Sequence, residues 1–421
     1  MSGYAQGGNS LTFDRTSKAD SLILDEARSK SPHEIPVPKF VLKSANNKFL
    51  MTIGGKVSAI MGWDIGNNLY NQDGAGISFT TQKIPVPATE GHRSDFFINP
   101  LNSAIDFQVV GLTDTPDQIT GYVKIAANKS NGSLKLSRAY ISWRGLTVGK
   151  KLTLFEDDNA AQPTTIDPEG PSGTVSTSVY EIGYKSKDYN GLKFAVGIDM
   201  PTWYASDGVY RGKDYPVFDG KQVADYGDAE QVLPDVPAWV EYSAPSGNRV
   251  RVSALLRNFA YRDLLAMTTR HMAGWGMMLS GNLKPSARTL VYYQLAYGKG
   301  IGAYLQDIAG MPLSFVPENS KPGRMTASPM AGINLGLTYN INSKWQANVM
   351  ASESRIWDVE DYAIAESGSN YKYALYAAGN VFYNITPYLQ WGMEYVWGHR
   401  QTWNIGGAHD SRIQTQLKFT F

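Results

Sequence analysis

The chain has 421 residues, a formal net charge of +1 and no cysteine, which excludes disulfides, thiolate catalysis and cysteine-ligated metal sites. The balanced charge offers no bulk attraction to nucleic acid, so any charge selectivity must come from where the charges lie. No stretch contains the roughly 18 consecutive apolar residues of a membrane-spanning helix, so a helical membrane protein is excluded.

The N-terminal part, residues 1–46, differs in composition from the rest of the chain. It opens with MSGYAQGG, which lacks the basic and apolar regions of a signal peptide, so we expect that a signal peptide has been removed. Residues 17–30 are charged around an apolar centre and predict a short helix, and residues 31–38 (SPHEIPVP) predict a proline-rich linker. We therefore expect a short periplasmic segment over 1–46 and one β unit over 47–421.

Strict alternation of apolar and polar residues begins near residue 48 and continues to the C-terminus. Successive side chains of a strand point to opposite faces, and segments of this length span a bilayer at a tilt. In the first segment the polar face includes Lys56, Ser58 and Asp64. Its other, mainly apolar face consists of Phe49, Met51, Ile53, Gly55, Val57, Ala59, Met61 and Trp63.

About sixteen such segments follow one another, an even number typical of porins. They are expected at 48–65, 102–111, 118–128, 133–144, 146–155, 178–186, 191–200, 237–244, 248–259, 271–283, 287–298, 327–341, 344–354, 370–383, 387–399 and 410–421. The connections alternate between short turns and long loops, with the short connection 128–132 as the exception. Outer-membrane barrels have short periplasmic turns and long external loops. The sequence therefore predicts an all-β fold, a transmembrane antiparallel β-barrel of about 16 strands.

The face opposite the apolar face is expected to point into the barrel, and it carries more basic than acidic residues. Because unpaired charges are costly to bury, this interior must hold water and the outside must contact lipid. Rings of charge at a constriction set the selectivity of such pores, so the basic excess predicts a mild preference for anions. The predicted pore-lining basic residues are Lys56, Lys124, Arg138, Arg144, Arg251, Arg257 and Arg412.

The third long connection, residues 156–177, is the candidate constriction loop. Carboxylates that face a basic wall would create a transverse field, which orients dipolar solutes, and the loop would limit the width of the pore. The alternative is an acidic loop on the outer surface, and the residues alone do not separate the two. The acidic residues of this loop are Glu156, Asp157, Asp158, Asp167 and Glu169.

Three short motifs resemble a known family. The chain ends QLKFTF at 416–421, an alternating strand with a terminal phenylalanine like the one read by the outer-membrane assembly machinery. The segments IGGKV at 53–57 and RAYISWRGLTVGK at 138–150 are similar to the DcaP-like trimeric porins of Gram-negative bacteria. The resemblance implies a homotrimer, a third loop folded into the lumen, and diffusion of small, often anionic, solutes.

Together these features predict an outer-membrane general porin for passive diffusion of small hydrophilic solutes. The expected partners are outer-membrane lipid, lipopolysaccharide and two further copies of the chain, with no cofactor and no nucleic acid. A channel specific for small organic acids or sugars is the alternative, followed by a barrel enzyme or an adhesin. Enzyme activity is not expected, because no Gly-x-Ser-x-Gly elbow accompanies the histidines. His399 and His409 flank one predicted loop, where a solvated pair is favoured over a metal site.

Overall fold

The computed structural model describes most of the chain from residue 40 onward. The described residues are 40–44, 48–66, 69–71, 76–87, 94–113, 115–129, 131–160, 162–201, 226–230, 233–263, 265–311, 314–318, 320–321, 323–359, 371–403 and 405–421. The predicted periplasmic segment 1–46 therefore lies almost entirely outside the described residues. None of the helices in the described part is long and apolar enough to cross a membrane.

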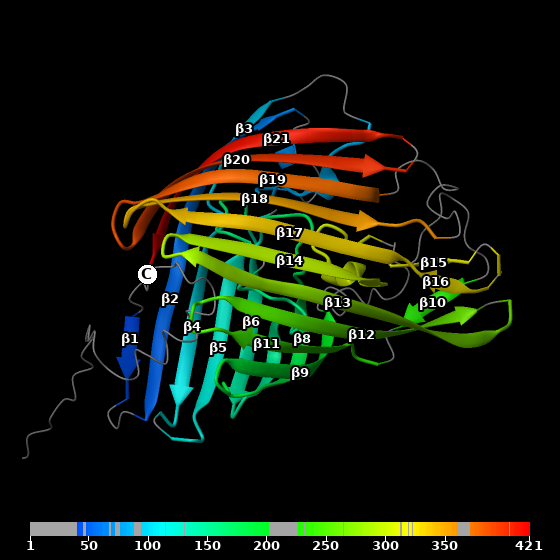
Figure 1. Ribbon diagram of the computed structural model, residues 1–421, viewed down its shortest axis with the longest axis horizontal. Helices are drawn as coiled ribbons and strands as arrows, with labels where there is room; N and C mark the ends of the chain where they lie inside the picture. The colour runs from blue at the N-terminus through cyan, green and yellow to red at the C-terminus, as the bar shows by residue number, and fades with distance from the viewer. Residues whose placement is uncertain are drawn as a thin grey trace, which may run out of the picture.

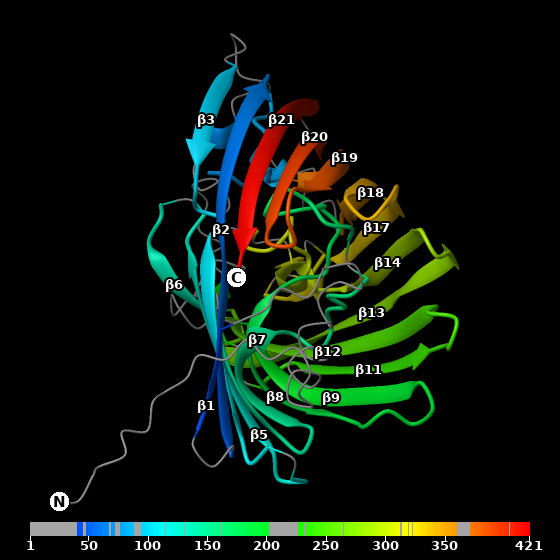
Figure 2. The ribbon, with the colours of Figure 1, turned by 90° about the vertical axis from the view of Figure 1, so that its left-hand side faces the viewer.

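The described strands form a closed antiparallel barrel of sixteen strands, as the alternation predicts (Figures 1 and 2). The strands are β1 (Phe40–Lys43), β2 (Phe49–Ile65), β3 (Asp95–Asn99), β4 (Ala104–Gly111), β5 (Ile119–Ala127), β6 (Leu134–Trp143), β7 (Leu146–Leu152), β8 (Ser178–Lys185), β9 (Leu192–Pro201), β10 (Tyr226–Glu230), β11 (Val236–Ser243), β12 (Arg249–Asp263), β13 (Thr268–Ser286), β14 (Thr289–Lys299), β15 (Phe315–Pro317), β16 (Met325–Ala327), β17 (Pro329–Asn340), β18 (Trp345–Ile356), β19 (Tyr371–Asn384), β20 (Leu389–Thr402) and β21 (Gly407–Thr420). Three short 3-10 helices lie in the loops: η2 (Leu69–Asn71), η3 (Thr81–Lys83) and η4 (Gly302–Tyr304). β3 and β4 together make one wall strand, as do β10 and β11.

Strand β2 closes the barrel. Its C-terminal half pairs with β21 from Lys56 to Ile65, and its N-terminal half pairs with β4. Phe421 exchanges two backbone hydrogen bonds with Gly55, of 2.8 and 3.0 Å, at the point where β21 ends. Beyond that point β1 pairs with β2, and the ring of Phe40 lies 6.3 Å from that of Phe421. β1 thus pairs with the part of β2 that lies beyond the end of β21, and it covers the edge of β2 that the C-terminus leaves open.

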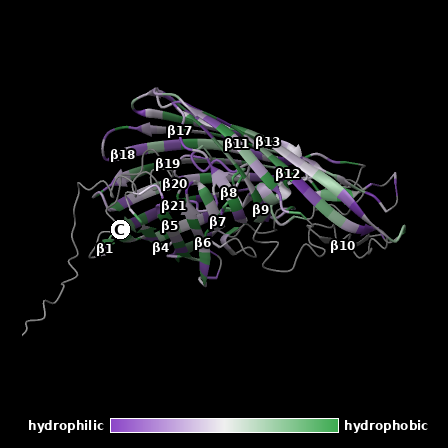
Figure 3. Cartoon of the chain, turned by 90° about the horizontal axis from the view of Figure 1, so that it is seen from below, coloured by the Kyte–Doolittle hydropathy of each residue, from purple (hydrophilic) through white to green (hydrophobic). Residues whose placement is uncertain are grey.

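Side chains alternate between a lipid-compatible outside and a polar inside. In β2, Val57 and Trp63 are more than half exposed on the outer face, whereas Ser58 and Asp64 are fully buried on the inner face. Figure 3 shows the same alternation of hydrophobic and hydrophilic bands along neighbouring strands. Outward aromatic rings gather at both strand ends: Trp345, Tyr383 and Trp391 at the turn end, and Trp275, Tyr297 and Trp357 at the loop end. An apolar band flanked by aromatic girdles is the outer surface of a membrane barrel.

Short turns gather at one end of the barrel and long connections at the other, as predicted. Two predicted loops are shorter than expected, because the strands continue further. β12 reaches Asp263 and β13 starts at Thr268, and β20 reaches Thr402 where the loop was expected from His399. His399 and His409 are therefore not loop residues but direct cross-strand partners of β20 and β21. Among the described residues no group of three His, Asp or Glu side chains is arranged to hold a metal ion.

Three long connections fold into the barrel from the loop end. Loop 153–177 and loop 300–328 pack together in the largest buried apolar cluster, which includes Phe155, Tyr304 and Met330. The described residues of loop 66–94 form a second cluster, in which Leu69, Phe79 and Ile84 contact inward side chains of β18–β21. Burial of these apolar side chains, at about 25 cal/mol per Å², holds the loops inside. Part of the barrel therefore has a dry core, where the alternation alone predicts only water.

Candidate channel interior

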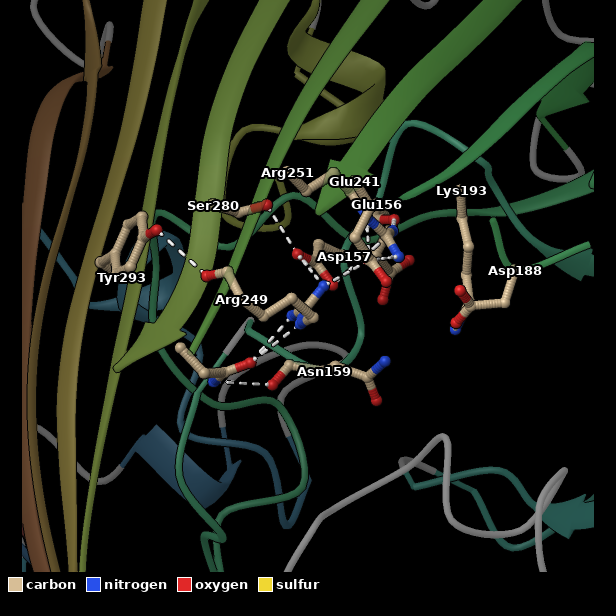
Figure 4. A network of polar contacts seen from close by, with 11 residues as sticks. Glu156, Asp157, Asn159, Asp188, Lys193, Glu241, Arg249, Arg251, Ser280 and Tyr293 are labelled. Atoms are coloured by element: carbon tan, nitrogen blue, oxygen red, sulfur yellow. Dashed lines mark hydrogen bonds and ion pairs between the residues drawn. The ribbon is translucent and has the colours of Figure 1, made fainter. Parts of the chain in front are cut away.

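Loop 153–177 is anchored to the barrel wall by an ion network near its first turn (Figure 4). The carboxylate of Asp157 lies 2.9 Å from Arg249 and 3.6 Å from Arg251, and it accepts a 2.6 Å hydrogen bond from Ser280. Glu241 on β11 lies 2.7 and 2.5 Å from the same two guanidinium groups. Burial alone would raise the pKa of Asp157, but Arg251 and Arg249 outweigh it and hold this pKa below its usual range. Two arginines and two carboxylates thus neutralise one another here.

The tip of the loop is held by two buried carboxyl groups. The backbone N–H groups of Ile166 and Asp167 donate to Glu394 of β20 at 3.0 and 2.8 Å. The side chain of Asp167 in turn accepts hydrogen bonds from the Tyr376 hydroxyl and from the backbone N–H of Phe79 in loop 66–94. Burial raises the pKa of Asp167. Asp167 therefore links loop 153–177 to loop 66–94 and to the barrel wall.

The returning part of the loop lies against the backbone of β17 and β18. A Cβ atom added at Gly173 would lie 2.2 Å from the carbonyl oxygen of Glu353, and one at Gly332 would lie 2.2 Å from the Gly173 carbonyl oxygen. The backbone N–H of Gly173 donates a 2.7 Å bond to Ser352. Only glycine permits such close approach of two backbones.

The wall beneath the loop is made of neutral polar side chains. Inward positions of β13, β14, β17–β19 and β21 carry hydroxyl and amide groups that bind one another and the loop backbone: Val175 donates to Gln294, Asn334 donates to Thr174, and Asn348 and Asn380 donate to the Thr164 carbonyl. Buried backbone groups need such partners. We call this surface the neutral wall; its inward polar residues are Ser280, Gln294, Asn334, Asn348, Ser352, Asn380, Gln414 and Gln416.

Two of the predicted pore-lining arginines point inward but are covered. Arg257 pairs with Asp235 at 3.0 Å, donates to the Gly300 carbonyl at 2.5 Å and has no exposed side-chain surface. Arg412 pairs with Asp64 and lies 4.9 and 5.5 Å from the rings of Phe97 and Phe79, also with no exposed surface. Loops 300–328 and 66–94 cover them, so the expectation that these residues line open lumen is corrected.

The other predicted basic residues fall into different places. Lys56 on β2 and Lys124 on β5 are inward and half-buried, and Lys56 donates a 2.8 Å bond to Asn102. Arg251 is almost fully buried in the ion network with Asp157. Arg144 lies in the turn after β6, with a positive φ of 49°, and pairs with Asp117 at 2.6 Å. It therefore belongs to the turn end of the barrel rather than to the wall.

Arg138, by contrast, stays open on the inner face of β6. It has neither an ion pair nor a side-chain hydrogen bond with the described residues. Its positive charge interacts electrostatically with the carboxyl group of Glu156. Two further inward cations share this property, Lys135 on β6 and Lys185 on β8. Lys185 lies 5.6 Å above the ring of Trp239. These three residues form what we call the basic wall, which loop 153–177 does not cover.

The five predicted acidic residues of the loop also differ from one another. Glu156 is buried; burial and the nearby Asp158 raise its pKa well above 4.5. Glu169 pairs with Lys129 at 3.4 Å. Asp158 is the exposed carboxylate, without an ion pair in the described part of the chain. Of the expected acidic face, only Asp158 offers open negative charge, while Asp157 and Asp167 serve to anchor the loop.

Sequence reasoning missed Lys135 and the neutral wall. Lys135 was missed because the β5–β6 pairing shifts between Lys124 and Ile125, so the extra residue Ser137 restores it to the inner face. The neutral wall had a detectable signal, a run of Asn, Gln and Ser at inward positions of consecutive strands.

Comparisons with known proteins agree on the fold. No protein-family model and no curated protein matches the sequence. Among solved structures, the outer membrane channel DcaP of Acinetobacter baumannii matches with a TM-score of 0.72 and 18% identity, over 91% of this chain and all of that one. OmpT of Vibrio cholerae, an outer-membrane protein, matches at 0.55 and 10% over 90% of this chain. The anion-selective porin from Comamonas acidovorans matches at 0.52 and 11% over 89%. Each of the last two is covered over its full length. The chain thus has the fold of outer-membrane porins.

Proposed function

We propose that this protein is an outer-membrane channel through which small polar solutes diffuse, with a preference for anions. The fold and the outward apolar band support the membrane setting. The observation that carries the anion preference is the basic wall: Lys135, Arg138 and Lys185 face inward without ion pairs in the described part of the chain. Arg249, Arg251, Arg257 and Arg412 are each paired with a carboxylate, and they contribute little field beyond one Debye length, about 8 Å.

Loop 153–177 supports the proposal by dividing the lumen. It is fastened to the neutral wall on one side, so passing solutes are expected to move between the loop and the basic wall. Arg138 and Asp158 then lie on the borders of this passage and would give a transverse field of the predicted sign. Among the described residues of the basic wall and of loop 153–177, three open cations face one open carboxylate. This excess favours anions, because lining charge raises the local concentration of counter-ions.

The test is the reversal potential of single channels in a planar bilayer under a KCl gradient. A sign that reports chloride permeating faster than potassium is expected. Potassium preference would keep the channel but contradict the basic wall as its dominant charge. No conductance from folded, inserted protein would contradict the channel itself.

A channel specific for small organic acids is the second candidate, favoured by the apolar and polar packing of loops 66–94 and 300–328 inside the barrel. Such packing narrows a lumen that a general porin keeps wide. Organic acids would then interrupt the chloride current at micromolar to millimolar concentration, whereas a general porin would show no saturable block.

The proposal includes assembly as a homotrimer with the loop end towards lipopolysaccharide. At the loop end of the barrel, outward aromatic residues occur on β13, β14, β19 and β20. The outward positions of β5–β7 at this end carry Ile125, Leu136 and Lys150 instead. A face without an aromatic girdle is expected to contact protein rather than lipid. OmpT has been solved in a form described as a trimer, with a TM-score of 0.53 to this chain. Native mass spectrometry in mild detergent would test it; a monomer at every protein concentration would contradict it.

A further inference from the structure

Three neighbouring turns at the turn end of the barrel carry no acidic residue, and the first two of them carry three cations. They connect β13 to β14, β17 to β18 and β19 to β20, and their sequences are KPSAR at 284–288, NINSKW at 340–345 and NITPYLQW at 384–391. The turns are joined by backbone hydrogen bonds, from Asn340 to the Arg288 carbonyl at 2.8 Å and from Asn384 to the Lys344 carbonyl at 2.9 Å. Lys284, Arg288 and Lys344 thus lie on one continuous rim.

These three cations are open. Each is exposed, and none makes an ion pair with the described residues. Two other cations of this end are paired within the described residues: Arg144 with Asp117 and Lys193 with Asp188. A rim that leaves three adjacent cations unmatched is suited to a ligand that brings negative charge.

Directly beside the cations lies a cluster of outward aromatic rings. The ring of Trp345 lies 4.7 Å from that of Tyr383 and 6.4 Å from that of Trp391. The ammonium group of Lys344 lies 6.0 Å from the centre of the Tyr383 ring. Tyr339, 41% exposed on β17, extends the ring cluster towards Arg288. We call the three cations and these four aromatic residues the rim patch.

We propose that the rim patch binds the phosphate-bearing headgroup of an anionic phospholipid in the adjacent leaflet. Tryptophan and tyrosine prefer the depth where acyl chains meet headgroups, so cations attached to this cluster lie at the level of lipid phosphates. The aromatic rings of the patch lie towards the membrane interior and its cations lie towards the turn end. This order matches a lipid, whose acyl chains point into the membrane and whose phosphate lies at its surface. An acidic protein or an anionic glycan would meet the cations but leave the aromatic half without a partner.

The test uses the full chain in mild detergent with equal amounts of phosphatidylglycerol and phosphatidylcholine of the same acyl chains, and native mass spectrometry to count retained lipids. Retention of phosphatidylglycerol over phosphatidylcholine is expected. The variant R288Q/K344Q is expected to lose most of this preference, up to about fivefold for each cation. The matched control R144Q/K187Q removes two turn-end cations outside the patch and should retain it. Heat-modifiability on gels confirms that each variant is folded.

Two further experiments distinguish a bound lipid from free phosphate and from an anionic glycan. Inorganic phosphate at millimolar concentration should leave the bound lipid in place, and full displacement would make the patch a free-phosphate site. Co-sedimentation with peptidoglycan sacculi should be unchanged in R288Q/K344Q; its loss, with lipid preference intact, would assign the patch to an anionic glycan and overturn the proposal. Equal retention of both lipids by the native chain, or equal loss in the control variant, would also overturn it.

Discussion

The two inner walls of this barrel obey the same alternation and yet serve opposite purposes. The neutral wall, over β13, β14, β17–β19 and β21, presents hydroxyl and amide groups that satisfy the backbone of loop 153–177. The basic wall, over β6–β8, presents Lys135, Arg138 and Lys185, which the loop does not cover. Neutral groups can be buried under a loop because each finds a hydrogen-bond partner, whereas an unpaired cation cannot be buried without a large desolvation penalty. The side-chain chemistry of a wall therefore decides whether it holds a loop or borders water.

Two arginines that loops do cover are both paired, as the cost of burying an unpaired cation requires. Arg257 and Arg412 lie under loops, and each has a carboxylate partner, Asp235 and Asp64 respectively. Both covered arginines are therefore neutralised by a carboxylate. Substitutions on the outer face, at the loop contact and at the base of the loop test this division.

The largest effect is expected from a charge placed on the outer, lipid-facing side of the barrel. Val196→Arg places a cation at a 47% exposed outward position of β9, at a cost of roughly 2–4 kcal/mol near the bilayer midplane. Ala126→Arg adds the same charge to the inner face of β5 and should fold normally. Folding into lipid vesicles, read as the heat-modifiable fraction on gels, distinguishes them. Equal folding yields would mean that the inside and outside are assigned wrongly.

Breaking the contact between loop 153–177 and the neutral wall should come next. Gly173→Val forces side-chain atoms into the backbone of β17 and β18, which costs about 1–3 kcal/mol if the loop stays and is relieved if the loop moves away. A changed single-channel conductance is therefore expected. Gly379→Val is the control, since its nearest neighbour atom would lie 3.9 Å from the new Cβ. Native conductance in Gly173→Val would contradict the close packing of the loop.

A smaller, pH-dependent effect is expected at the base of the loop. Burial raises the pKa of Glu156, so the folded state binds its proton more tightly than the unfolded state does. The stability of the native chain should then fall as pH rises from the ordinary value of 4.5 towards the raised value, because ionisation favours unfolding. Glu156→Gln removes this dependence, with a gain of about 1 kcal/mol at neutral pH. Urea unfolding at pH 4.5 and pH 7 checks it; an equal difference between native and variant at both pH values would contradict the raised pKa.

The strand order could be predicted from the sequence because a period of two is a local property. The positions of Val57 outside and Ser58 inside follow from parity alone. Parity, however, gives only the face and not what covers it. The burial of Arg412 depends on the Ile77 carbonyl and on Phe79, more than 300 positions away in the chain. The close approach of Gly173 to Gly332 is equally non-local. Parity thus predicts which face of a strand a charged residue occupies, but it predicts neither which charges a loop covers nor that Arg144 lies in a turn.

In the proposed channel, the open cations of the basic wall set the selectivity. The most direct test is the chloride-to-potassium permeability ratio of the variant K135Q/R138Q/K185Q beside the matched control K187Q/K284Q/K344Q. Each variant removes three cations, but only the first removes them from the lumen. We expect a ratio above one for the native chain, unchanged in the control and lowered to about one or below in the lumen variant. A native ratio in the lumen variant would contradict the claim.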